Sequence, residues 1–408
     1  MDVRINYQPN KVSDALIDLP SSKSISNRLL IIDALSGFKS ELTNLSQARD
    51  TDLMQTLLAS TETTLNAKDA GTTYRFLTAY LALSSHQSVT LTGEERMYKR
   101  PIGILVDVLR QLGADIRYLH QEGYPPLSIT GRPLRSPGII QINGSISSQF
   151  ISALLLIGPY IENGLSLELL PPVASEPYIT MTIALMRAFG AEVSYVDHLL
   201  LIQPKPYVPH AYRVEADWSG ACFFYSLASL TRERYHIPGL MDQSLQADRA
   251  IADIMTHLGV HTDYSSDGVT LSPSVSTTDH LEIDCHAYPD LVPALVVALG
   301  LVGRSATLTS IGHLRYKECD RITALQTELQ KVGMQISVEH ETMMISGKAK
   351  VEPHISINTY RDHRMAMCFS ILAIQAPIII QDAEVVHKSF PNYWDIIQGL
   401  GMDVNEVS

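Results

Sequence analysis

The segment V-L-R-Q-L-G-A-D-I-R-Y at 108–118 has a design that recurs four more times along the chain. Each copy reads as the end of a helix, a glycine, and then alternating apolar and polar residues. Glycine suits the left-handed conformation that closes a helix, and the alternation is typical of a half-buried strand. The other copies are L-M-R-A-F-G-A-E-V-S-Y (185–195), I-M-T-H-L-G-V-H-T-D-Y (254–264), E-L-Q-K-V-G-M-Q-I-S-V (328–338) and I-I-Q-G-L-G-M-D-V-N-E (396–406).

The spacing of these glycines describes the folding unit. Successive glycines lie 77, 69, 74 and 68 positions apart, at Gly113, Gly190, Gly259, Gly333 and Gly401. A period of about 70 residues is too long for a solenoid repeat. It predicts instead a larger unit that is used several times. Residues 53–66 read as a shortened further copy that lacks the glycine.

Length and charge limit the class of protein. The 408 residues, 45% of them apolar, can bury two ordinary cores, so we expect two domains. A net charge of −12 argues against a nucleic-acid surface, which needs an excess of Lys and Arg. The proline-rich stretch at 203–210 predicts a crossing between domains at about 210–217. The first eighteen residues read as strands.

Targeting and redox signals point to the cytoplasm. The start, M-D-V-R-I-N, lacks the apolar core of a secretory signal, and the apolar stretches near 150–157 and 291–302 are too short to span a bilayer. We therefore expect no membrane partner. The four cysteines lack C-x-x-C spacing, which favours a reducing compartment and no structural zinc. They are Cys222, Cys285, Cys319 and Cys368.

Basic residues gather where helices are expected to begin. In S-S-K-S-I-S-N-R (21–28), Lys23 precedes an apolar helix, although a helix N-terminus carries partial positive charge and disfavours a cation without an anion beside it. The same pattern recurs at other predicted first turns. Several such helix ends facing one space would form a strong anion site. The cations are Lys23, Arg28, Arg75, Lys317, Arg321, Arg361, Arg364 and Lys388.

Seven motifs in order carry a resemblance over nearly the full chain. The chain resembles the 5-enolpyruvylshikimate-3-phosphate synthases, a family of enolpyruvyl transferases. The motifs are S-K-S-I-S-N-R (22–28), D-A-G-T-T-Y-R (69–75), L-T-G-E-E-R-M-Y-K-R-P-I (91–102), G-S-I-S-S-Q-F (144–150), K-E-C-D-R-I (317–322), D-H-R-M-A-M (362–367) and K-S-F-P (388–391).

The resemblance implies an α/β (α+β) fold. Two similar domains would each contain three βαβαββ repeats in an inside-out α/β barrel, joined by a hinge. The first lobe would span 19–215, and the second would combine 1–18 with 216–408. The active site would lie in the cleft between the lobes.

The resemblance also implies the reaction. Members transfer the enolpyruvyl group of phosphoenolpyruvate to the 5-hydroxyl of shikimate 3-phosphate and release phosphate through a tetrahedral intermediate. We expect neither a metal nor an organic cofactor, and we expect a cytoplasmic monomer. Both substrates are phosphorylated carboxylates, which explains the need for many Arg and Lys donors.

Substrate-binding residues carry over by position. The residues implied to bind shikimate 3-phosphate are Lys23, Ser24, Arg28, Ser147, Ser148, Gln149, Ser175, Tyr178, Asp290 and Lys317. Those implied to bind phosphoenolpyruvate are Lys23, Gly71, Arg100, Gln149, Arg321, Arg364 and Lys388. The residues implied to line the pocket are Asp69, Thr72, Arg75, His313 and His363. Gly71 would leave room for a phosphonate mimic such as glyphosate.

Three residues would exchange protons. By similarity, Asp290 would be the base toward the 5-hydroxyl, Glu318 the acid toward the methylene carbon, and Lys23 a shared carrier and clamp. Without the other motifs, Asp290 would read as a helix cap and Glu318 as a first-turn acid that complements the helix dipole.

The chain departs from the family pattern at a few positions. Ser21-Ser22 stands where a glycine is usual, and Asp69 and His313 each replace a usual Asn. An acid at 69 beside an anion site would either point outward or pair with Arg75. The shortened stretch at 57–69 predicts a hairpin missing from the first domain.

Three other interpretations are weighed against this one. A UDP-N-acetylglucosamine enolpyruvyl transferase usually has Lys-Asn where this chain has Lys23-Ser24, and a cysteine in the loop that here offers Met97 and Tyr98. A P-loop nucleotide enzyme is excluded, since no G-x-x-x-x-G-K-[ST] precedes the serines. A noncatalytic anion-binding relative stays open, although the intact Lys23, Asp290 and Glu318 speak against it.

Overall fold

The computed structural model describes residues 1–9, 15–84, 88–145, 147–276 and 278–407. Contacts divide the chain into two compact units. Unit 1 is Met1–Ser22, Gln47–Arg49 and Glu215–Ser408, and unit 2 is Lys23–Ser46 and Asp50–Val214. At the border, Ser22 N–H donates to the carbonyl of Glu215 over 2.9 Å. The lobe limits implied by the resemblance, 19–215 for the first lobe and 1–18 with 216–408 for the second, remain predictions.

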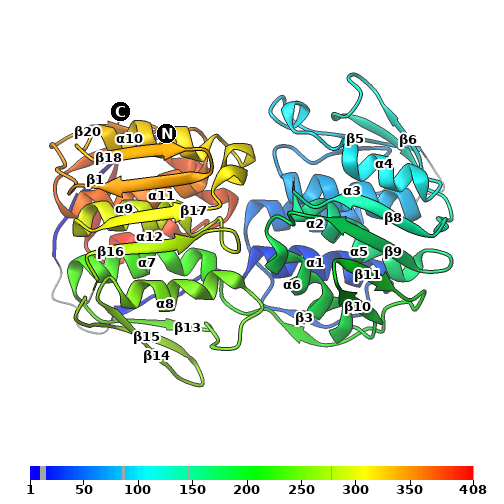
Figure 1. Ribbon diagram of the computed structural model, residues 1–408, viewed down its shortest axis with the longest axis horizontal. Helices are drawn as coiled ribbons and strands as arrows, with labels where there is room; N and C mark the ends of the chain where they lie inside the picture. Colours follow the sequence, from blue (N-terminus) through cyan, green and yellow to red (C-terminus); the bar gives the residue numbers. More distant parts are fainter. Residues whose placement is uncertain (10–14, 85–87, 146, 277, 408) are drawn as a thin grey trace. The chain divides into compact units, whose positions relative to one another are not determined.

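One βαβαββ topology recurs in both units (Figure 1). A first strand leads through a helix to a second, parallel strand, and a second helix then leads into an antiparallel hairpin. In the sheet, the fourth strand of the repeat lies between the second and the third, as in the order β4-β5-β7-β6. The predicted α/β fold with repeated βαβαββ units is confirmed.

Unit 2 holds two complete repeats and one shortened repeat. The first complete repeat is β4 (Thr64–Asn66), α3 (Gly71–Ser84), β5 (Ser88–Thr92), α4 (Gly103–Gln111), β6 (Asp115–Tyr118) and β7 (Leu127–Thr130). The second is β8 (Ile139–Asn143), α5 (Ser148–Ile157), β9 (Leu165–Leu170), α6 (Glu176–Ala188), β10 (Val193–Val196) and β11 (Leu199–Ile202). The shortened repeat is β12 (Tyr212–Arg213), α1 (Lys23–Leu35), β3 (Leu42–Thr43) and α2 (Arg49–Ala59).

Unit 1 holds three complete repeats. The first is β2 (Ala15–Leu16), α7 (Trp218–Thr231), β13 (Tyr235–Pro238), α8 (Ile251–Thr256), β14 (Val260–Tyr264) and β15 (Gly268–Pro273). The second is β16 (His280–Asp284), α9 (Val292–Val302), β17 (Ser305–Thr309), α10 (Arg321–Gln330), β18 (Gln335–Glu339) and β19 (Thr342–Ser346). The third is β20 (Ile355–Ile357), α11 (His363–Ser370), β21 (Ile378–Ile380), α12 (Tyr393–Gly399), β22 (Met402–Val407) and β1 (Asp2–Tyr7).

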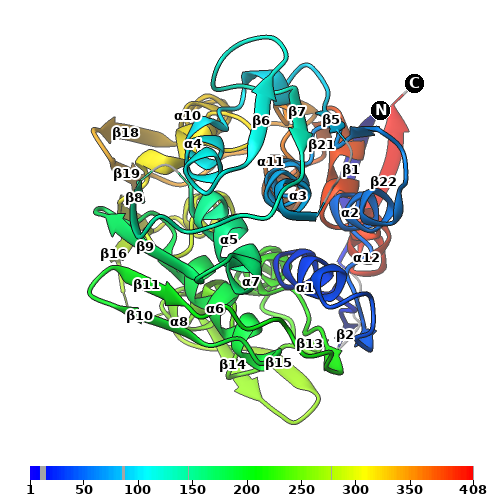
Figure 2. The ribbon, with the colours of Figure 1, turned by 90° about the vertical axis from the view of Figure 1, so that its right-hand side faces the viewer.

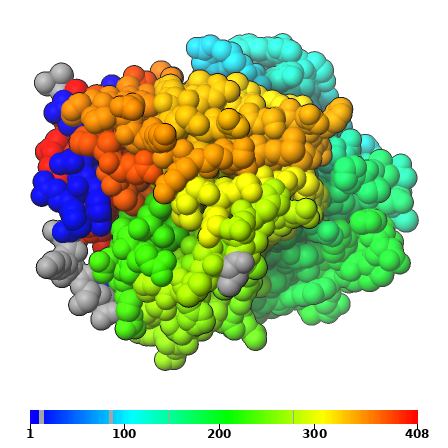
Figure 3. Space-filling view, turned by 60° about the vertical axis from the view of Figure 1, so that its left-hand side comes forward, coloured from blue at the N-terminus to red at the C-terminus, as the bar shows by residue number. Residues whose placement is uncertain are grey.

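The N-terminal strand β1 completes the C-terminal sheet. Val3 pairs with Ile380 of β21, and Ile5 pairs with Val404 of β22, both antiparallel. In Figure 3 the blue N-terminal segment accordingly lies against the orange and red C-terminal segments. Of the strands predicted in the first eighteen residues, β1 and β2 are present and belong to the sheets of unit 1, and residues 10–14 lie outside the described residues.

The first helix of each repeat lies in a core. In α9 every residue from Val292 to Leu301 is buried, and in α5 nine of the ten residues are buried. In unit 1, α9 packs against both α7 and α11. In unit 2, α1, α3 and α5 pack on one another (Figure 2). The second helices bury only one face, as α4 does with Leu105, Val106, Val108 and Leu109.

The predicted helix–glycine–strand junctions are confirmed in all five copies. Each glycine follows the end of a second helix and has a φ between +78° and +98°, the left-handed region that favours glycine. In the shortened repeat, α2 leads directly to β4, and the sheet contains only β3 and β12. The hairpin predicted to be missing near 57–69 is therefore missing.

The strands of the described residues form separate sheets. Five sheets have four strands and one has two, and within the described part of the chain none of them closes into a barrel. The inside-out barrel implied by the resemblance is therefore a set of separate sheets with buried helices, not a closed β-barrel.

Candidate active site

Lys23 is the first residue of α1, as predicted. Its Nζ donates to Oδ2 of Asp50, in the first turn of α2, over 3.2 Å. Asp50 is buried, and its second oxygen, Oδ1, has no hydrogen-bond partner in the described structure. A buried carboxylate with one such contact stabilises the ammonium and fixes its position.

Arg28 lies one turn further along α1, in the core of unit 2. Its Nε donates to Oγ1 of Thr182 (2.7 Å), Nη1 to the carbonyl of Ser24 (2.8 Å), and Nη2 to Oγ of Ser152 (3.1 Å) and to the carbonyl of Tyr178 (3.3 Å). These acceptors are all uncharged. Burial lowers the pKa of Arg28 to about 10, so the group stays a cation at neutral pH. A buried cation with neutral acceptors favours an anionic ligand.

Gln149 joins two of the predicted helix starts. Its Oε1 accepts from Nη1 of Arg75 over 2.5 Å, and its Nε2 donates to Oγ1 of Thr72 over 3.0 Å. The Arg75 guanidinium also lies 5.1 Å from the ring centroid of Phe150. Gln149 therefore links the starts of α3 and α5 within unit 2. The resemblance assigns residues of both starts to the phosphoenolpyruvate pocket.

Gly71 is the first residue of α3 and touches Arg100. A Cβ atom built on Gly71 would lie 2.8 Å from Cζ of Arg100, closer than real Cβ contacts come. The glycine therefore makes room for this guanidinium at the helix start. Asp69 lies two residues earlier.

The serines before α5 and α6 differ in how they act. Oγ of Ser147 accepts from the N–H of Gln149 over 3.3 Å and caps α5, which begins at Ser148. Ser175 precedes α6 with a φ of 54°, an uncommon conformation for serine, and its side chain does not cap the helix; Pro177 lies just inside α6.

In unit 1, Arg321 brings together three carboxylates. It is the first residue of α10, and its side chain is 1% exposed. Nη1 donates to Oδ1 of Asp290 (2.9 Å), Nη2 to Oε2 of Glu318 (2.9 Å), and Nε to Oδ2 of Asp362 (2.8 Å). The two residues predicted to transfer protons, Asp290 and Glu318, therefore share one guanidinium.

Arg364 holds the other oxygen of Asp290. Its Nη2 donates to Oδ2 of Asp290 over 2.9 Å, and its Nη1 donates to the backbone carbonyl of Asp290 over 3.2 Å. Asp362 caps α11 and accepts from the N–H of Arg364 over 2.9 Å. Asp290 is thus clamped between two arginines from different helices. We call Asp290, Glu318, Arg321, Asp362 and Arg364 the Asp290 cluster.

The cations around Asp290 control its charge. Burial alone would raise the pKa of Asp290, but Arg364, Lys317 and Arg321 outweigh burial and hold it well below its usual value. Burial lowers the pKa of Lys317, and Asp290 opposes this shift. In this structure, therefore, Asp290 is an ionised carboxylate and a weak base.

A partly buried histidine and a buried aspartate lie near the Asp290 cluster. Burial, reinforced by Lys317, lowers the pKa of His313 to about 4, so this imidazole is neutral at pH 7. Burial and the Asp290 carboxylate raise the pKa of Asp248 to about 7, although Arg364 opposes the shift. Oγ of Ser219 donates to Oδ2 of Asp248.

Lys388 does not occupy a first turn. It is the last residue of the 3₁₀ helix Ala383–Lys388, and α12 begins only at Tyr393. The prediction of a cation at a helix start is therefore wrong for this residue, and a cation at a helix end is favoured by the dipole. It is also wrong for Lys317, which directly follows the 3₁₀ helix Gly312–Tyr316 and lies four residues before α10. Lys388 is nonetheless buried. His363 is the first residue of α11, and its Nδ1 lies 3.7 Å from Oδ1 of Asp362.

Two residues of the site escaped the sequence analysis. Asp362 stands in the quoted D-H-R motif, yet its role depends on Arg321, 41 positions away. Asp50 pairs with Lys23 across 27 positions. Each is an acid at a helix start, a pattern that an ordinary capping role explains equally well.

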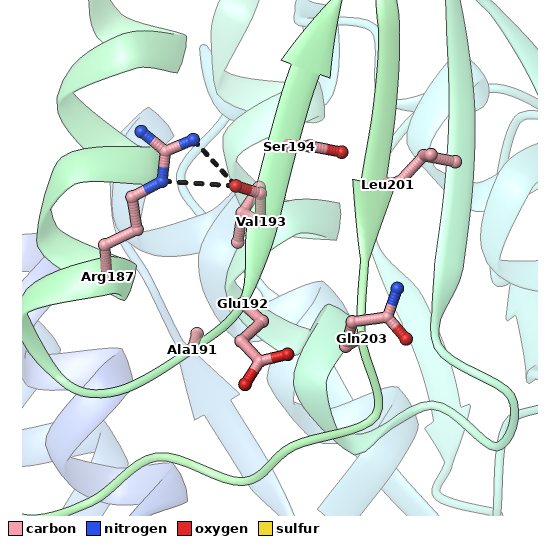
Figure 4. A pocket seen from close by; sticks show the side chains of 7 residues that line it. All are labelled: Arg187, Ala191, Glu192, Val193, Ser194, Leu201 and Gln203. Atoms are coloured by element: carbon pink, nitrogen blue, oxygen red, sulfur yellow. Dashed lines mark hydrogen bonds between the residues drawn. The ribbon is translucent and has the colours of Figure 1, made fainter.

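A surface hollow in unit 2 contains none of the predicted site residues. Figure 4 shows it between the end of α6 and strands β10 and β11. Two guanidinium nitrogens of Arg187 donate to the carbonyl of Val193, over 3.2 and 2.7 Å. Glu192 pairs with Lys205 over 2.8 Å. The charged groups of the hollow thus already have partners.

The described residues contain no cluster of His, Cys, Asp or Glu arranged to hold a metal ion. None of the helices in the described ranges has the length and apolar character needed to cross a membrane.

Known proteins match the chain over nearly its whole length. The family model described as EPSP synthase (3-phosphoshikimate 1-carboxyvinyltransferase) matches residues 55–397. A 3-phosphoshikimate 1-carboxyvinyltransferase of Bacteroides fragilis is 42% identical over 399 residues, which cover 96% of this chain and 97% of the relative. The protein of that name from Haemophilus influenzae is 34% identical, over 96% and 98% of the two chains.

Solved structures share the fold. An EPSP synthase from Acinetobacter baumannii matches with a TM-score of 0.80 at 23% identity, over 100% of both chains. The enolpyruvyl transferase NikO from Streptomyces tendae matches with a TM-score of 0.75 at 15% identity, over 100% of this chain and 99% of that one. The family model and the relatives agree with the motifs, and the chain belongs to the EPSP synthase (3-phosphoshikimate 1-carboxyvinyltransferase) family.

Proposed function

We propose that the chain is a 3-phosphoshikimate 1-carboxyvinyltransferase. It transfers the enolpyruvyl group of phosphoenolpyruvate to the 5-hydroxyl of shikimate 3-phosphate and releases phosphate. The reaction belongs to the shikimate pathway, which leads to chorismate and the aromatic amino acids. Family membership supports this proposal, and one observation carries its chemistry: Asp290 and Glu318 share the guanidinium of Arg321.

The addition step needs a base and an acid. Asp290 accepts the proton of the 5-hydroxyl while the oxygen of this hydroxyl bonds to C2 of phosphoenolpyruvate. Glu318 gives a proton to the methylene carbon, which becomes a methyl group in the tetrahedral adduct. In the elimination step the Glu318 carboxylate takes a proton back from that methyl group, the C–O bond to phosphate breaks, and phosphate departs with the bonding electrons. Lys23 is assigned as the shared proton carrier and clamp.

The substrate itself activates the base. Without ligand, Arg364, Lys317 and Arg321 lower the pKa of Asp290. The phosphate and carboxylate groups of phosphoenolpyruvate compete for the same guanidinium groups, which are well suited to bidentate contacts with both. When these cations turn to the substrate, the pKa of Asp290 rises and its carboxylate becomes a better base.

The cationic and polar residues assigned by the resemblance would hold the substrates. Shikimate 3-phosphate would contact Lys23, Ser24, Arg28, Ser147, Ser148, Gln149, Ser175, Tyr178, Asp290 and Lys317. Phosphoenolpyruvate would contact Lys23, Gly71, Arg100, Gln149, Arg321, Arg364 and Lys388. Asp69, Thr72, Arg75, His313 and His363 would line its pocket. We place this reaction in the cytoplasm and assign it to a monomer without metal or organic cofactor.

Release of phosphate tests the proposal. The purified chain is mixed with phosphoenolpyruvate and with shikimate 3-phosphate, with UDP-N-acetylglucosamine, or with no acceptor. We expect phosphate only with shikimate 3-phosphate. Release with the sugar nucleotide would assign the chain to the other acceptor, which the family match does not favour. Tight substrate binding without phosphate release would indicate a noncatalytic relative.

A further inference from the structure

A turn with left-handed backbone conformation leads into α11 and ends at Asp362 of the Asp290 cluster. Residues 359–362 form it: the carbonyl of Thr359 accepts from the N–H of Asp362 over 2.8 Å, and the two central residues, Tyr360 and Arg361, have φ values of 53° and 55°. Positive φ at both central positions is the type I′ pattern, which Gly, Asn and Asp dominate. Two bulky residues in this conformation persist only where their surroundings hold them.

The restraint comes from a buried carboxylate on the neighbouring helix. Glu328, near the end of α10, is 1% exposed. Its Oε1 accepts from the hydroxyl of Tyr360 over 2.7 Å, and its Oε2 accepts from the N–H of Asn358 over 3.2 Å and from Nζ of Lys331 over 2.5 Å. Oδ1 of Asn358 in turn accepts from the N–H of Tyr360 over 2.7 Å. Both oxygens of Glu328 are therefore used to hold the turn.

Helix α10 contacts the turn 359–362 at two points along its length. At its first turn, Arg321 donates to Asp362, and two turns later Glu328 accepts from Tyr360. The turn lies between the two contacts and leads into Asp362 and Arg364. Because Arg321 and Arg364 each hold one oxygen of Asp290, the position of the turn decides whether both arginines reach that carboxylate.

We infer that Glu328 and Tyr360 are positioning residues for the reaction: they lock the strained turn 359–362 and so fix Asp362 and Arg364 around Asp290. The inference rests on the proposed function for its kinetic consequence. Buried hydrogen bonds in the low dielectric of a protein core restrain geometry strongly, and burial together with Glu328 raises the pKa of Tyr360 to about 12, so its hydroxyl remains a donor at neutral pH.

The matched variants are Tyr360→Phe and Glu328→Gln, with Tyr235→Phe as control. The control also removes one tyrosine hydroxyl of unit 1, which lies 2.9 Å from Oγ1 of Thr231. For the first two variants we expect kcat/KM for phosphoenolpyruvate to fall between about 10- and 100-fold, because small misplacements of catalytic groups have effects of this size. KM for shikimate 3-phosphate and the kinetics of Tyr235→Phe should stay near wild type.

A relief variant separates positioning from general destabilisation. Glycine adopts positive φ without a steric penalty, so adding Arg361→Gly to Tyr360→Phe lowers the strain that the lost hydrogen bond had restrained. We expect part of the kcat/KM for phosphoenolpyruvate to return. Because glycine at this φ also stabilises the folded chain, urea unfolding of each variant is measured beside the kinetics. A kcat/KM that falls in Tyr360→Phe and partly returns in the double variant, while both chains stay fully folded under assay conditions, shows positioning and not a loss of stability.

Hydrogen exchange tests the lock without any turnover. The amide of Asp362 closes the turn, so its exchange should be faster in Tyr360→Phe and Glu328→Gln and unchanged in Tyr235→Phe. Unchanged exchange, or unchanged kcat/KM for phosphoenolpyruvate, would overturn the inference. If the wild-type chain showed no turnover, the proposed function would fail, and the exchange of Asp362 would still decide whether Glu328 locks the turn.

Discussion

The two units handle buried arginines in opposite ways. In unit 1, Arg321 contacts three carboxylates and Arg364 contacts one of them again. In unit 2, Arg28 is equally buried but its acceptors are hydroxyl and carbonyl oxygens. The carboxylates of unit 1 can exchange protons, whereas the uncompensated charge of Arg28 can attract an anion. One topology thus holds arginines that are paired with carboxylates in unit 1 and an arginine with only neutral acceptors in unit 2.

Removing each arginine should separate the two environments most strongly. Arg321→Met leaves Asp290, Glu318 and the buried Asp362 without their shared cation, and we expect the free energy of unfolding to fall by about 3–5 kcal/mol. Arg28→Met removes a donor from neutral acceptors only, and two of these, Oγ of Ser152 and the carbonyl of Tyr178, still accept from Thr182, so we expect a loss of about 1–3 kcal/mol. Urea unfolding followed by circular dichroism measures both. An equal or larger loss for Arg28→Met would break the comparison.

Gly71, in unit 2, should determine how much space is available for a small anion. Gly71→Ala places a methyl group against the Arg100 guanidinium, and overpacking of this kind costs about 1–3 kcal/mol. We expect inhibition by glyphosate, competitive with phosphoenolpyruvate, to weaken more than the KM for phosphoenolpyruvate rises. Steady-state inhibition assays on both proteins measure this difference. Equal losses for substrate and inhibitor would contradict the steric explanation.

Two groups should make the stability of unit 1 depend on pH, and their effects run in opposite directions. His313 has a pKa of about 4 in the folded chain, below the unfolded value of about 6.5, so its contribution is lost as pH falls through that window. Asp248 has a pKa of about 7, above its unfolded value of about 3.9, so its contribution is lost as pH rises.

Two variants expose these opposing slopes. The unfolding free energy of His313→Gln minus that of wild type should decrease as pH rises from about 4 to 6.5. The same difference for Asp248→Asn should increase over this range. Urea midpoints across this range measure both trends. Arg28→Met should leave the slope unchanged, because the pKa of Arg28, about 10, lies outside the range. Parallel slopes for the two unit 1 variants would refute the assignment.

The glycine junctions should behave alike in both units. A Cβ atom on Gly113 in unit 2 or on Gly333 in unit 1 meets nothing within 4 Å, so only the positive φ opposes a side chain. Gly113→Ala and Gly333→Ala should each cost about 1–2 kcal/mol of unfolding free energy. Thermal unfolding of the two variants checks this smallest effect. A neutral result in one unit would show that the junctions are not equivalent.

Local features of the fold were predictable from the sequence, and long-range pairings were not. The glycine junctions and the starts of α1, α3 and α5 follow from the chemistry of a few neighbouring residues. The partners of Asp362 and Asp50 depend on chain segments 41 and 27 positions away, which no local pattern fixes. Lys388 was misplaced because a short 3₁₀ helix ends at that residue and no periodicity announces it.

The assignment of proton transfer to Asp290 is tested most directly by Asp290→Asn, which keeps the shape of the side chain but cannot accept the hydroxyl proton. Single-turnover phosphate release is measured at saturating concentrations of both substrates, and steady-state phosphate release by Arg28→Met is measured over a range of shikimate 3-phosphate concentrations. We predict a rate about 10²–10⁴-fold lower for Asp290→Asn, since general base catalysis contributes on this scale, and for Arg28→Met mainly a higher KM for shikimate 3-phosphate. Turnover by Asp290→Asn at the wild-type rate would contradict the account.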